Sequence, residues 1–292
     1  MLNEFKTRTV QRDGVQLHTR FAGDGPPLLL LHGHPQSSVM WHRVAPALAK
    51  NRRVVMMDLR GYGDSSRPPA DVSHLNHSKR EMALDAVEVM RQYGFDRFDV
   101  LAHDRGARVA HRLALDFEHK VQRLMLLDIA PTLSMYSHTS EAFARAYWHW
   151  FFLIQPAPLP ETLLEGAPSQ YVRGVMGSRH AGLAAFAPEA LAEYERCAMQ
   201  PGTAASICED YRASASIDLE HDRADVALGR KLSQPLRVLW GEHGAVARCF
   251  DVLSLWRDRA QDVSGYALPC GHYLAEELPE RVIDEAQAFF KF

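Results

Sequence analysis

The sequence has no apolar run long enough to cross a membrane. Its longest run, residues 26–31, falls far short of the roughly 20 residues that a membrane-spanning helix requires. Residues 1–12 mix charged and polar side chains and lack the apolar core of a secretory signal peptide. We therefore expect a soluble, cytoplasmic protein that does not have a membrane as partner.

Cysteine is scarce and the net charge is small. The four cysteines show no C-x-x-C spacing, which favours reduced thiols and gives no sign of a metal site. The formal net charge of −3 gives no general reason to expect nucleic acid as a partner. Gly61 and Gly63 lack the third glycine and the following helix of a dinucleotide-binding loop. No cofactor is therefore indicated.

Apolar runs alternate with helical patterns along most of the chain. A hairpin is predicted at residues 5–11 and 15–21, because Asp13-Gly14 between them is a strong turn dipeptide. Further strands are predicted at residues 27–31, 53–58, 97–101, 121–127, 236–240 and 263–268. Helices are predicted at residues 38–50, 78–93, 106–115, 250–259 and 279–290. This alternation predicts an α/β fold whose mostly parallel sheet has helices on both faces.

The pattern changes in the middle of the chain. Between residues 133 and 232 only helical segments and loops are indicated, and the alternation returns at residue 236. We therefore predict a core domain formed by residues 1–132 and 233–292, with residues 133–232 inserted as a helical cap. Such a cap would fold over the strand ends, where open α/β sheets bind their ligands.

The segment around Asp104 carries the strongest chemical signal. Residues 100–108 read Val-Leu-Ala-His-Asp-Arg-Gly-Ala-Arg, so a strand turns sharply into a helix at Asp104. Gly106 supplies the small residue that so tight a turn needs two positions after its apex. This is the pattern of a nucleophile elbow. Most elbows carry serine, whereas a carboxylate can attack carbon and form an ester. The alternative is that Asp104 merely caps the helix.

Two later residues, Asp128 and His272, complete the chain order of nucleophile, acid and histidine. His272 follows the last predicted strand, and its imidazole would take a proton from water. Asp128 ends the strand at residues 121–127 and would hold His272 in the useful tautomer. Many hydrolases of this layout place the acid one strand later. This chain has Gly241-Glu242-His243-Gly244 there, which leaves Glu242 as the alternative acid.

Two arginines and a loop accompany the elbow. Arg105 and Arg108 bring fixed positive charge close to Asp104, and a planar guanidinium matches a carboxylate, so we expect them to bind a substrate carboxylate. The alternative for Arg108 is a solvated helix face. The loop His32-Gly33-His34-Pro35 follows a central strand and can aim backbone N–H groups at the elbow as an oxyanion hole. The alternative there is a plain strand-to-helix turn.

The run His103-Asp104-Arg105-Gly106-Ala107-Arg108, with His149-Trp150 in the predicted cap, resembles fluoroacetate dehalogenase, a branch of the α/β-hydrolase superfamily. The similarity extends from the His32-Gly33 loop to His272. It implies that Asp104 displaces halide from the α-carbon, that His272 activates the water that hydrolyses the ester, and that Asp128 orients His272. It further implies a homodimer that acts on a small-molecule haloacid.

The resemblance also implies how the substrate is held. The carboxylate clamp would be formed by Arg105 and Arg108, and the halide pocket by His149, Trp150 and Tyr211. Three donors aimed at a poor leaving group such as fluoride would stabilise its developing charge. Tyr147 and Tyr194 compete for the tyrosine position, and the aromatic run at residues 147–152 can also serve simply to pack the cap.

The chain departs from this family at His34, where His-Gly-Phe-Pro is common. The backbone N–H of His34 survives the change and would form the oxyanion hole with the N–H of Arg105. The imidazole ring, however, alters the shape and polarity of the space beside the halide. The preference between fluoride and other halides therefore stays open.

Two alternative functions are compatible with the same residues. Epoxide hydrolases and haloalkane dehalogenases also have an aspartate elbow, but they usually carry tryptophan directly after the nucleophile, and Arg105 suits a neutral substrate badly. A hydrolase fold kept only for binding is the other reading, and the complete set of Asp104, Asp128 and His272 disfavours it. We expect cofactor-free hydrolysis of haloacetate, fluoroacetate first, to glycolate and halide.

Overall fold

The computed structural model describes residues 1–291 and is built on an eight-stranded sheet. The strands lie in the order β1-β2-β4-β3-β5-β6-β7-β8. Their bounds are β1 (Lys6–Arg12), β2 (Val15–Ala22), β3 (Pro27–Leu31), β4 (Arg53–Met57), β5 (Phe98–His103), β6 (Val121–Leu127), β7 (Leu236–Gly241) and β8 (Val263–Leu268). The pairs β1·β2 and β2·β4 are antiparallel and the others are parallel. The predicted mostly parallel α/β sheet is confirmed.

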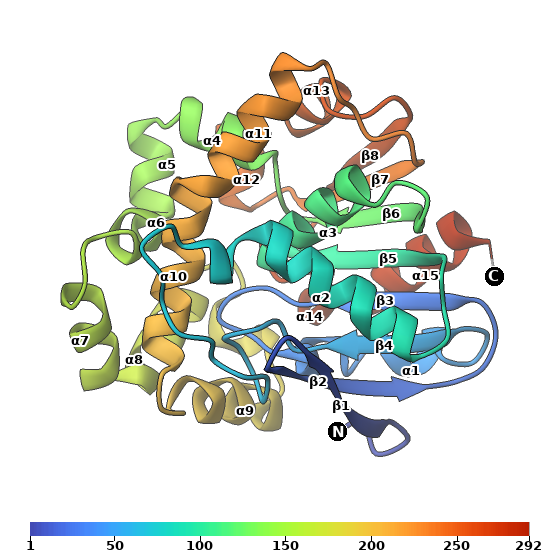
Figure 1. Ribbon diagram of the computed structural model, residues 1–292, viewed down its shortest axis with the longest axis horizontal. Coiled ribbons are helices and arrows are strands. Elements are labelled where there is room, and N and C mark those ends of the chain that lie inside the picture. Colours follow the sequence, from blue (N-terminus) through green and yellow to red (C-terminus); the bar gives the residue numbers. More distant parts are fainter. Residues whose placement is uncertain (292) are drawn as a thin grey trace.

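Helices cover both faces of this sheet (Figure 1). They are η1 (Ser38–Trp41), α1 (Ala45–Leu48), η2 (Leu75–His77), α2 (Lys79–Gln92), α3 (Asp104–Asp116), α12 (Ala245–Cys249), α13 (Val252–Arg257), α14 (Leu274–Glu277) and α15 (Pro279–Phe290). Leu29 and Leu31 of β3 belong to the core under α2 and α3, whereas Leu28 and Leu30 belong to the core under α1 and α15. Successive strand residues point to opposite faces, so a continuous apolar run serves both cores.

Eight further α-helices lie between β6 and β7 in the sequence. They are α4 (Thr132–Ser137), α5 (Glu141–Ala146), α6 (Trp148–Leu153), α7 (Leu159–Gly166), α8 (Pro168–Gly177), α9 (Pro188–Ala198), α10 (Thr203–Ala215) and α11 (Ile217–Ala227), with the short η3 (Gly182–Ala185). Figure 1 shows α5 to α10 gathered at one end of the sheet, on the left of the view. We call residues 133–232 the cap.

Two predicted helices differ from the structure. Residues 38–50 form η1 and the four-residue α1 instead of one continuous helix. Pro46 lies in the first turn of α1. A proline there is tolerated because its missing N–H has no partner in a first turn, but a helix running through it would lose a hydrogen bond and clash. The helix expected at residues 250–259 is likewise shorter, since α13 begins after Asp251 caps it.

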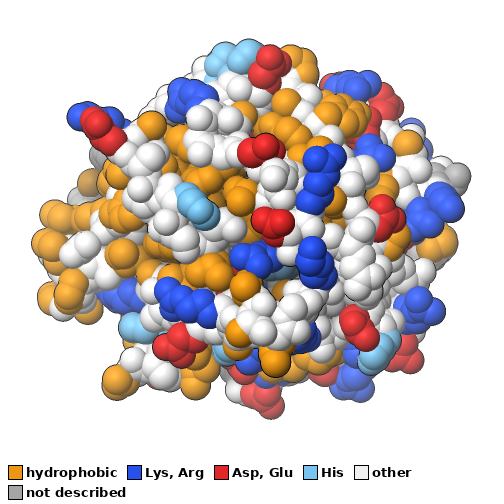
Figure 2. All heavy atoms as spheres, turned by 90° about the horizontal axis from the view of Figure 1, so that it is seen from above, with side chains coloured by type: hydrophobic (Ala, Val, Ile, Leu, Met, Phe, Trp, Pro, Cys, Tyr) orange, Lys and Arg blue, Asp and Glu red, His pale blue; other side chains and the backbone are white. Residues whose placement is uncertain are grey.

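The surface shows mixed charge where Figure 2 displays it. On that face, lysine and arginine side chains alternate with aspartate and glutamate side chains and with small apolar areas, and they do not merge into one continuous patch. Within residues 1–291, each helix is too short or too polar to form a membrane span.

Candidate active site

Asp104 stands where β5 ends and α3 begins, in a left-handed backbone conformation with φ of 45°. Such a conformation is strained for a residue with a side chain and marks functional sites. A Cβ atom on Gly106 would lie 2.4 Å from the carbonyl oxygen of His32 and 2.6 Å from the carbonyl carbon of Leu31. Only glycine therefore allows α3 to pass this close to the end of β3.

The carboxylate of Asp104 does not cap the helix. The residue at the N-cap position of α3 is His103, without a capping side-chain bond. Asp104 Oδ1 instead accepts a hydrogen bond of 2.9 Å from the backbone N–H of His34. The capping alternative is thus wrong. The N–H of Arg105 belongs to the first turn of α3, where backbone N–H groups lack an intrahelical acceptor.

Asp128 and His272 meet beside Asp104. His272 Nδ1 lies 2.5 Å from Asp128 Oδ2, and the N–H of Gly241 donates to Asp128 Oδ1 at 2.9 Å. His272 Nε2 lies 3.9 Å from Asp104 Oδ2, which is too long for a direct hydrogen bond. His272 can therefore act on a water that lies next to Asp104. The side chain of Glu242 is exposed, and Asp128 occupies the position beside the imidazole.

The charges around Asp104 keep it ionised. Burial raises the pKa of Asp104, but the charges of His272, His103, Arg108 and Arg105 lower it by more, so that the pKa lies below its usual value. A nucleophilic carboxylate must be anionic when it attacks. The surroundings of Asp104 thus favour the ionised form that the predicted role requires.

Arg105 is fully buried and already has an acidic partner in the cap. Its Nε and Nη2 each donate to a carboxylate oxygen of Asp210 in α10, both at 2.8 Å. The guanidinium carbon also lies 4.1 Å from the ring centre of Tyr211. The remaining nitrogen, Nη1, has no hydrogen-bond partner within residues 1–291. We call such buried, unpaired nitrogen and hydroxyl groups open donors.

Arg108 is buried as well, so the solvated-face alternative is wrong. Its Nη1 donates to the hydroxyl of Thr132 at 2.8 Å, and its guanidinium lies 4.7 Å from the ring centre of Trp150. Its Nε is an open donor among the described residues. Each arginine beside Asp104 thus retains one unpaired nitrogen that can donate to a ligand. A carboxylate has two oxygens, which is the matching number of acceptors.

The three residues predicted to hold a halide lie together in the cap. The ring centres of His149 and Tyr211 are 5.9 Å apart, and those of Trp150 and Tyr211 are 6.3 Å apart. Trp150 Nε1 is an open donor of the described chain. Burial and then the charge of Arg179 push the pKa of His149 far below its usual value, so the imidazole is neutral at pH 7.

The two competing tyrosines lie elsewhere around the site. The hydroxyl of Tyr194 donates to Glu276 Oε1 at 2.6 Å. Tyr147 stacks on His149, with ring centres 5.5 Å apart, and also contacts His272 at 6.4 Å. Tyr147 therefore stands on the catalytic-histidine side of the cluster, whereas Tyr211 stands beside Arg105.

His34 adds a polar ring next to this cluster. Its Nε2 lies 2.9 Å from the hydroxyl of Tyr171, and its ring stacks on His149 at 6.1 Å. Burial lowers the pKa of His34 to about 3, so the ring is neutral at physiological pH. His34 thus changes the hydrogen bonding beside the pocket without adding a charge.

Sequence reasoning missed three residues around Asp104: Asp210, which holds Arg105; Tyr136, whose buried hydroxyl is an open donor within residues 1–291; and Arg179. Asp210 directly precedes Tyr211, and an acid beside a predicted site residue was the one available signal. Tyr136 and Arg179 stand in cap segments with no motif, so only the folded chain reveals them.

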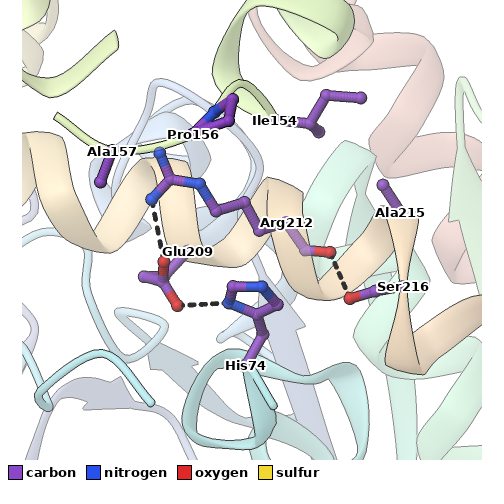
Figure 3. Close-up of a pocket in the computed structure, with 8 residues that line it drawn as sticks. All are labelled: His74, Ile154, Pro156, Ala157, Glu209, Arg212, Ala215 and Ser216. Atoms are coloured by element: carbon purple, nitrogen blue, oxygen red, sulfur yellow. Dashed lines mark hydrogen bonds and ion pairs between the residues drawn. The ribbon is translucent and has the colours of Figure 1, made fainter. Parts of the chain in front are cut away.

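Two other features lie outside this site. His18, Asp58 and Asp64 place one ligand atom each within 4.8 Å of one another, but the oxygens of Asp58 already accept the N–H groups of Ser38 and Asp64, at 2.7 and 3.0 Å. A pocket of about 470 Å³ is lined in part by His74, Glu209 and Arg212, and Figure 3 shows Glu209 bound to both His74 and Arg212. Neither feature includes a predicted catalytic residue.

Comparison with known proteins agrees with this geometry. Residues 26–181 match the family model described as alpha/beta hydrolase fold. A fluoroacetate dehalogenase from Burkholderia sp. is 42% identical over 96% of this chain and 92% of its own. A soluble epoxide hydrolase from Corynebacterium sp. is 33% identical over 99% of each chain. The solved structure of a provisionally assigned alpha/beta hydrolase from Nostoc sp. PCC 7120 covers 99% of each chain at 54% identity and a TM-score of 0.95.

Proposed function

This chain belongs to the alpha/beta hydrolase family, and from this premise we propose that it hydrolyses haloacetates, fluoroacetate among them, to glycolate and halide. The observation that carries the proposal is the pair of buried arginines beside a carboxylate nucleophile, each with an open donor in the described chain. Two such donors suit an anionic substrate. The similarity to a fluoroacetate dehalogenase supports the same class.

The first step is a displacement at carbon. The substrate carboxylate binds Arg105 Nη1 and Arg108 Nε, which turns the α-carbon toward Asp104. An oxygen of Asp104 attacks that carbon, and the carbon–halogen bond breaks with its electron pair going to the halide. Trp150 Nε1, with His149 and Tyr211, stabilises the departing anion. The products are halide and the carboxymethyl ester of Asp104.

The second step hydrolyses this ester. His272 takes a proton from water, and the oxygen attacks the carbonyl carbon of the Asp104 ester. The N–H of His34, which donates to Asp104 Oδ1 in the free protein, stabilises the oxyanion together with the N–H of Arg105. The bond from the carbonyl carbon to the oxygen of the carboxymethyl group then breaks, His272 returns its proton to that oxygen, and glycolate leaves. The carboxyl group of Asp104 finally releases its proton to solvent. Asp128 stabilises the imidazolium between these events.

Epoxide hydrolysis is the second candidate, and the Corynebacterium relative favours it. The same aspartate would open an epoxide to a hydroxyalkyl ester. A neutral epoxide, however, would leave the open donors of Arg105 and Arg108 without acceptors, and buried unpaired donors cost free energy. Charge on the substrate therefore separates the two candidates.

The test is halide release by the purified protein from fluoroacetate and chloroacetate, measured with ion-selective electrodes, beside hydrolysis of a neutral aryl epoxide. We expect release from the haloacids, and we expect Arg108→Leu to lower kcat/KM for them at least about a hundredfold, since a charge-assisted bond contributes several kcal/mol in a buried site. Arg145→Leu, an exposed cap arginine paired with Glu141, is the matched control. Turnover of the epoxide alone would replace the proposal with the second candidate.

A further inference from the structure

A cavity of about 220 Å³ lies between the cap and the loop that follows β7. The mechanism above does not use it. The cap contributes Arg179 and His180 to its wall, and the core contributes His243, Gly244, Arg248 and His272. Because His272 lines the cavity, it reaches the imidazole that is proposed to activate water. His180, His243 and Arg248 are exposed, so the other side of the cavity faces solvent.

The wall of this cavity carries positive charge. Arg179 and Arg248 are cations, and the rings of His180 and His243 lie 4.4 Å apart. The lining residues, all of them in the described chain, include no aspartate or glutamate. Gly244 lies beside Asp128: a Cβ atom there would be 3.5 Å from Asp128 Oδ1, and the N–H of Gly244 donates to the carbonyl of Gly241 at 2.9 Å. An anion in this space therefore meets the charges of Arg179 and Arg248, with Asp128 as the neighbouring negative charge.

Of the two arginines in the wall, Arg179 is partly buried and Arg248 is exposed. The charge of Arg179 lacks a direct counter-ion. Its guanidinium lies 4.6 Å from the ring centre of Tyr147, and its Nη1 donates to the carbonyl of Ala146 at 3.3 Å. Its Nε is an open donor, and across residues 1–291 it takes part in no ion pair. Most of the buried arginines differ from this partly buried one: Arg105, for example, is paired with Asp210.

The charge of Arg179 reaches the catalytic carboxylates. It interacts electrostatically with both Asp104 and Asp128. An anionic substrate that approaches these two carboxylates is repelled by them, and a neighbouring cation offsets that repulsion. Arg179 and His272 both line the cavity, and His272 contacts Asp128. The charge of Arg179 therefore acts on an anion in the same cavity that reaches this imidazole.

We propose that this cavity is an anion-binding vestibule, in which Arg179 holds the carboxylate of an incoming small haloacid before it passes to Arg105 and Arg108. The inference rests on the proposed dehalogenation and extends it to the route that the substrate takes. Charged walls around a narrow opening focus the field and raise association rates, and salt weakens this effect. The vestibule therefore acts on kcat/KM and leaves kcat nearly unchanged.

The experiment replaces Arg179 with methionine, which keeps length and apolar contact but removes the charge. For chloroacetate we expect kcat/KM to fall about tenfold through KM, with a much flatter dependence on ionic strength between about 0.02 and about 0.5 M. Arg179→Lys restores most of the loss because it retains the charge. Arg173→Met, on the preceding helix α8, removes an exposed arginine that is paired with Glu195, and it leaves both quantities unchanged.

Three outcomes overturn the vestibule: a fall in kcat at constant KM, a salt dependence equal to that of the wild type, or the same losses in Arg173→Met. Binding of acetate, measured by calorimetry, gives a readout without turnover, and it is several-fold weaker in Arg179→Met if the inference holds. If the wild type releases no halide from any haloacid, the proposed function fails. The acetate comparison then still decides the role of the cavity.

Discussion

His272 is the residue at which the two halves of the proposed reaction separate. It lies 3.9 Å from Asp104, too far to assist the carboxylate as it attacks carbon, but well placed for a water between them. His272→Asn should therefore allow the first displacement and stop the second. With chloroacetate, we expect the protein to gain one carboxymethyl group, about 58 Da, as an ester, measured by intact mass spectrometry.

The control for this adduct is the double variant Asp104→Asn with His272→Asn, which lacks the nucleophile and gains no mass. Peptide mapping of the single variant places the added group on Asp104. An adduct on another residue, or release of halide in many turnovers without an adduct, contradicts the two-step scheme.

The order of residues along the chain was enough to predict those site residues that directly follow a strand. Asp104, Asp128 and His272 each follow a strand, and strand ends of a parallel sheet meet at one edge, so the order along the chain already implied that they meet. The partner of Arg105 could not be predicted in this way. Asp210 comes from the cap, 105 residues later, and its approach depends on how α10 packs. Arg179 was missed for the same reason.

At the scale of elements, the elbow depends on the contact between α3 and the end of β3. A methyl group on Gly106 would press on backbone atoms of His32 and Leu31, which cannot rotate away. Gly106→Ala should therefore destabilise the fold by about 1–3 kcal/mol, as overpacking in a core does, and displace Asp104. Urea unfolding measures the first effect and halide release the second.

Gly174 provides the matched control for this substitution. It lies inside α8, and a Cβ atom there would meet nothing within 4 Å. Because glycine within a helix costs conformational entropy, Gly174→Ala should stabilise the fold by roughly 0.5–1 kcal/mol. A loss at Gly106 no larger than the change at Gly174 shows that α3 has room to move.

Element types were predicted best where burial alone decides them. The strands β3 and β6 and the helix α15 match the predicted bounds, because each is a pronounced apolar run or a long periodic pattern. The strand β8 also matches, although only Leu268 in it is buried. The short helices α12 and α14 were not predicted. A helix of four or five residues has little intrinsic stability, so its presence depends on the tertiary contacts around it.

At the scale of the whole molecule, a buried carboxyl group joins the cap to the core. Glu276 of α14 accepts the hydroxyl of Tyr194 from α9, and Gln36, from the loop after β3, approaches the same oxygen at 3.5 Å. Burial raises the pKa of Glu276 from its ordinary 4.5 to about 7, although Tyr194 opposes the rise. At a pH between these two values, the carboxyl group of Glu276 is protonated in the folded protein and ionised in the unfolded chain.

Stability should therefore fall as pH rises between about 4.5 and about 7, because the folded state binds more protons in this window. One such group contributes a slope of at most about 1.4 kcal/mol per pH unit. We expect Glu276→Gln, which stays neutral, to remove this part of the slope in urea unfolding at pH 5, 6 and 7. Glu280→Gln, an exposed change on α15, serves as the reference, and equal slopes in both variants exclude Glu276.

The strands β6 and β7, between which the cap is inserted, are neighbours in the sheet. Leu124 pairs with Leu236 and Leu127 with Leu239 in parallel register, so the chain leaves the core at the end of β6 and returns to the start of the neighbouring strand. A change confined to residues 133–232 would leave this register, and Asp128 directly after β6, in place. Evolution can therefore vary His149, Trp150 and Tyr211 in the cap while Asp104, Asp128 and His272 in the core keep their positions.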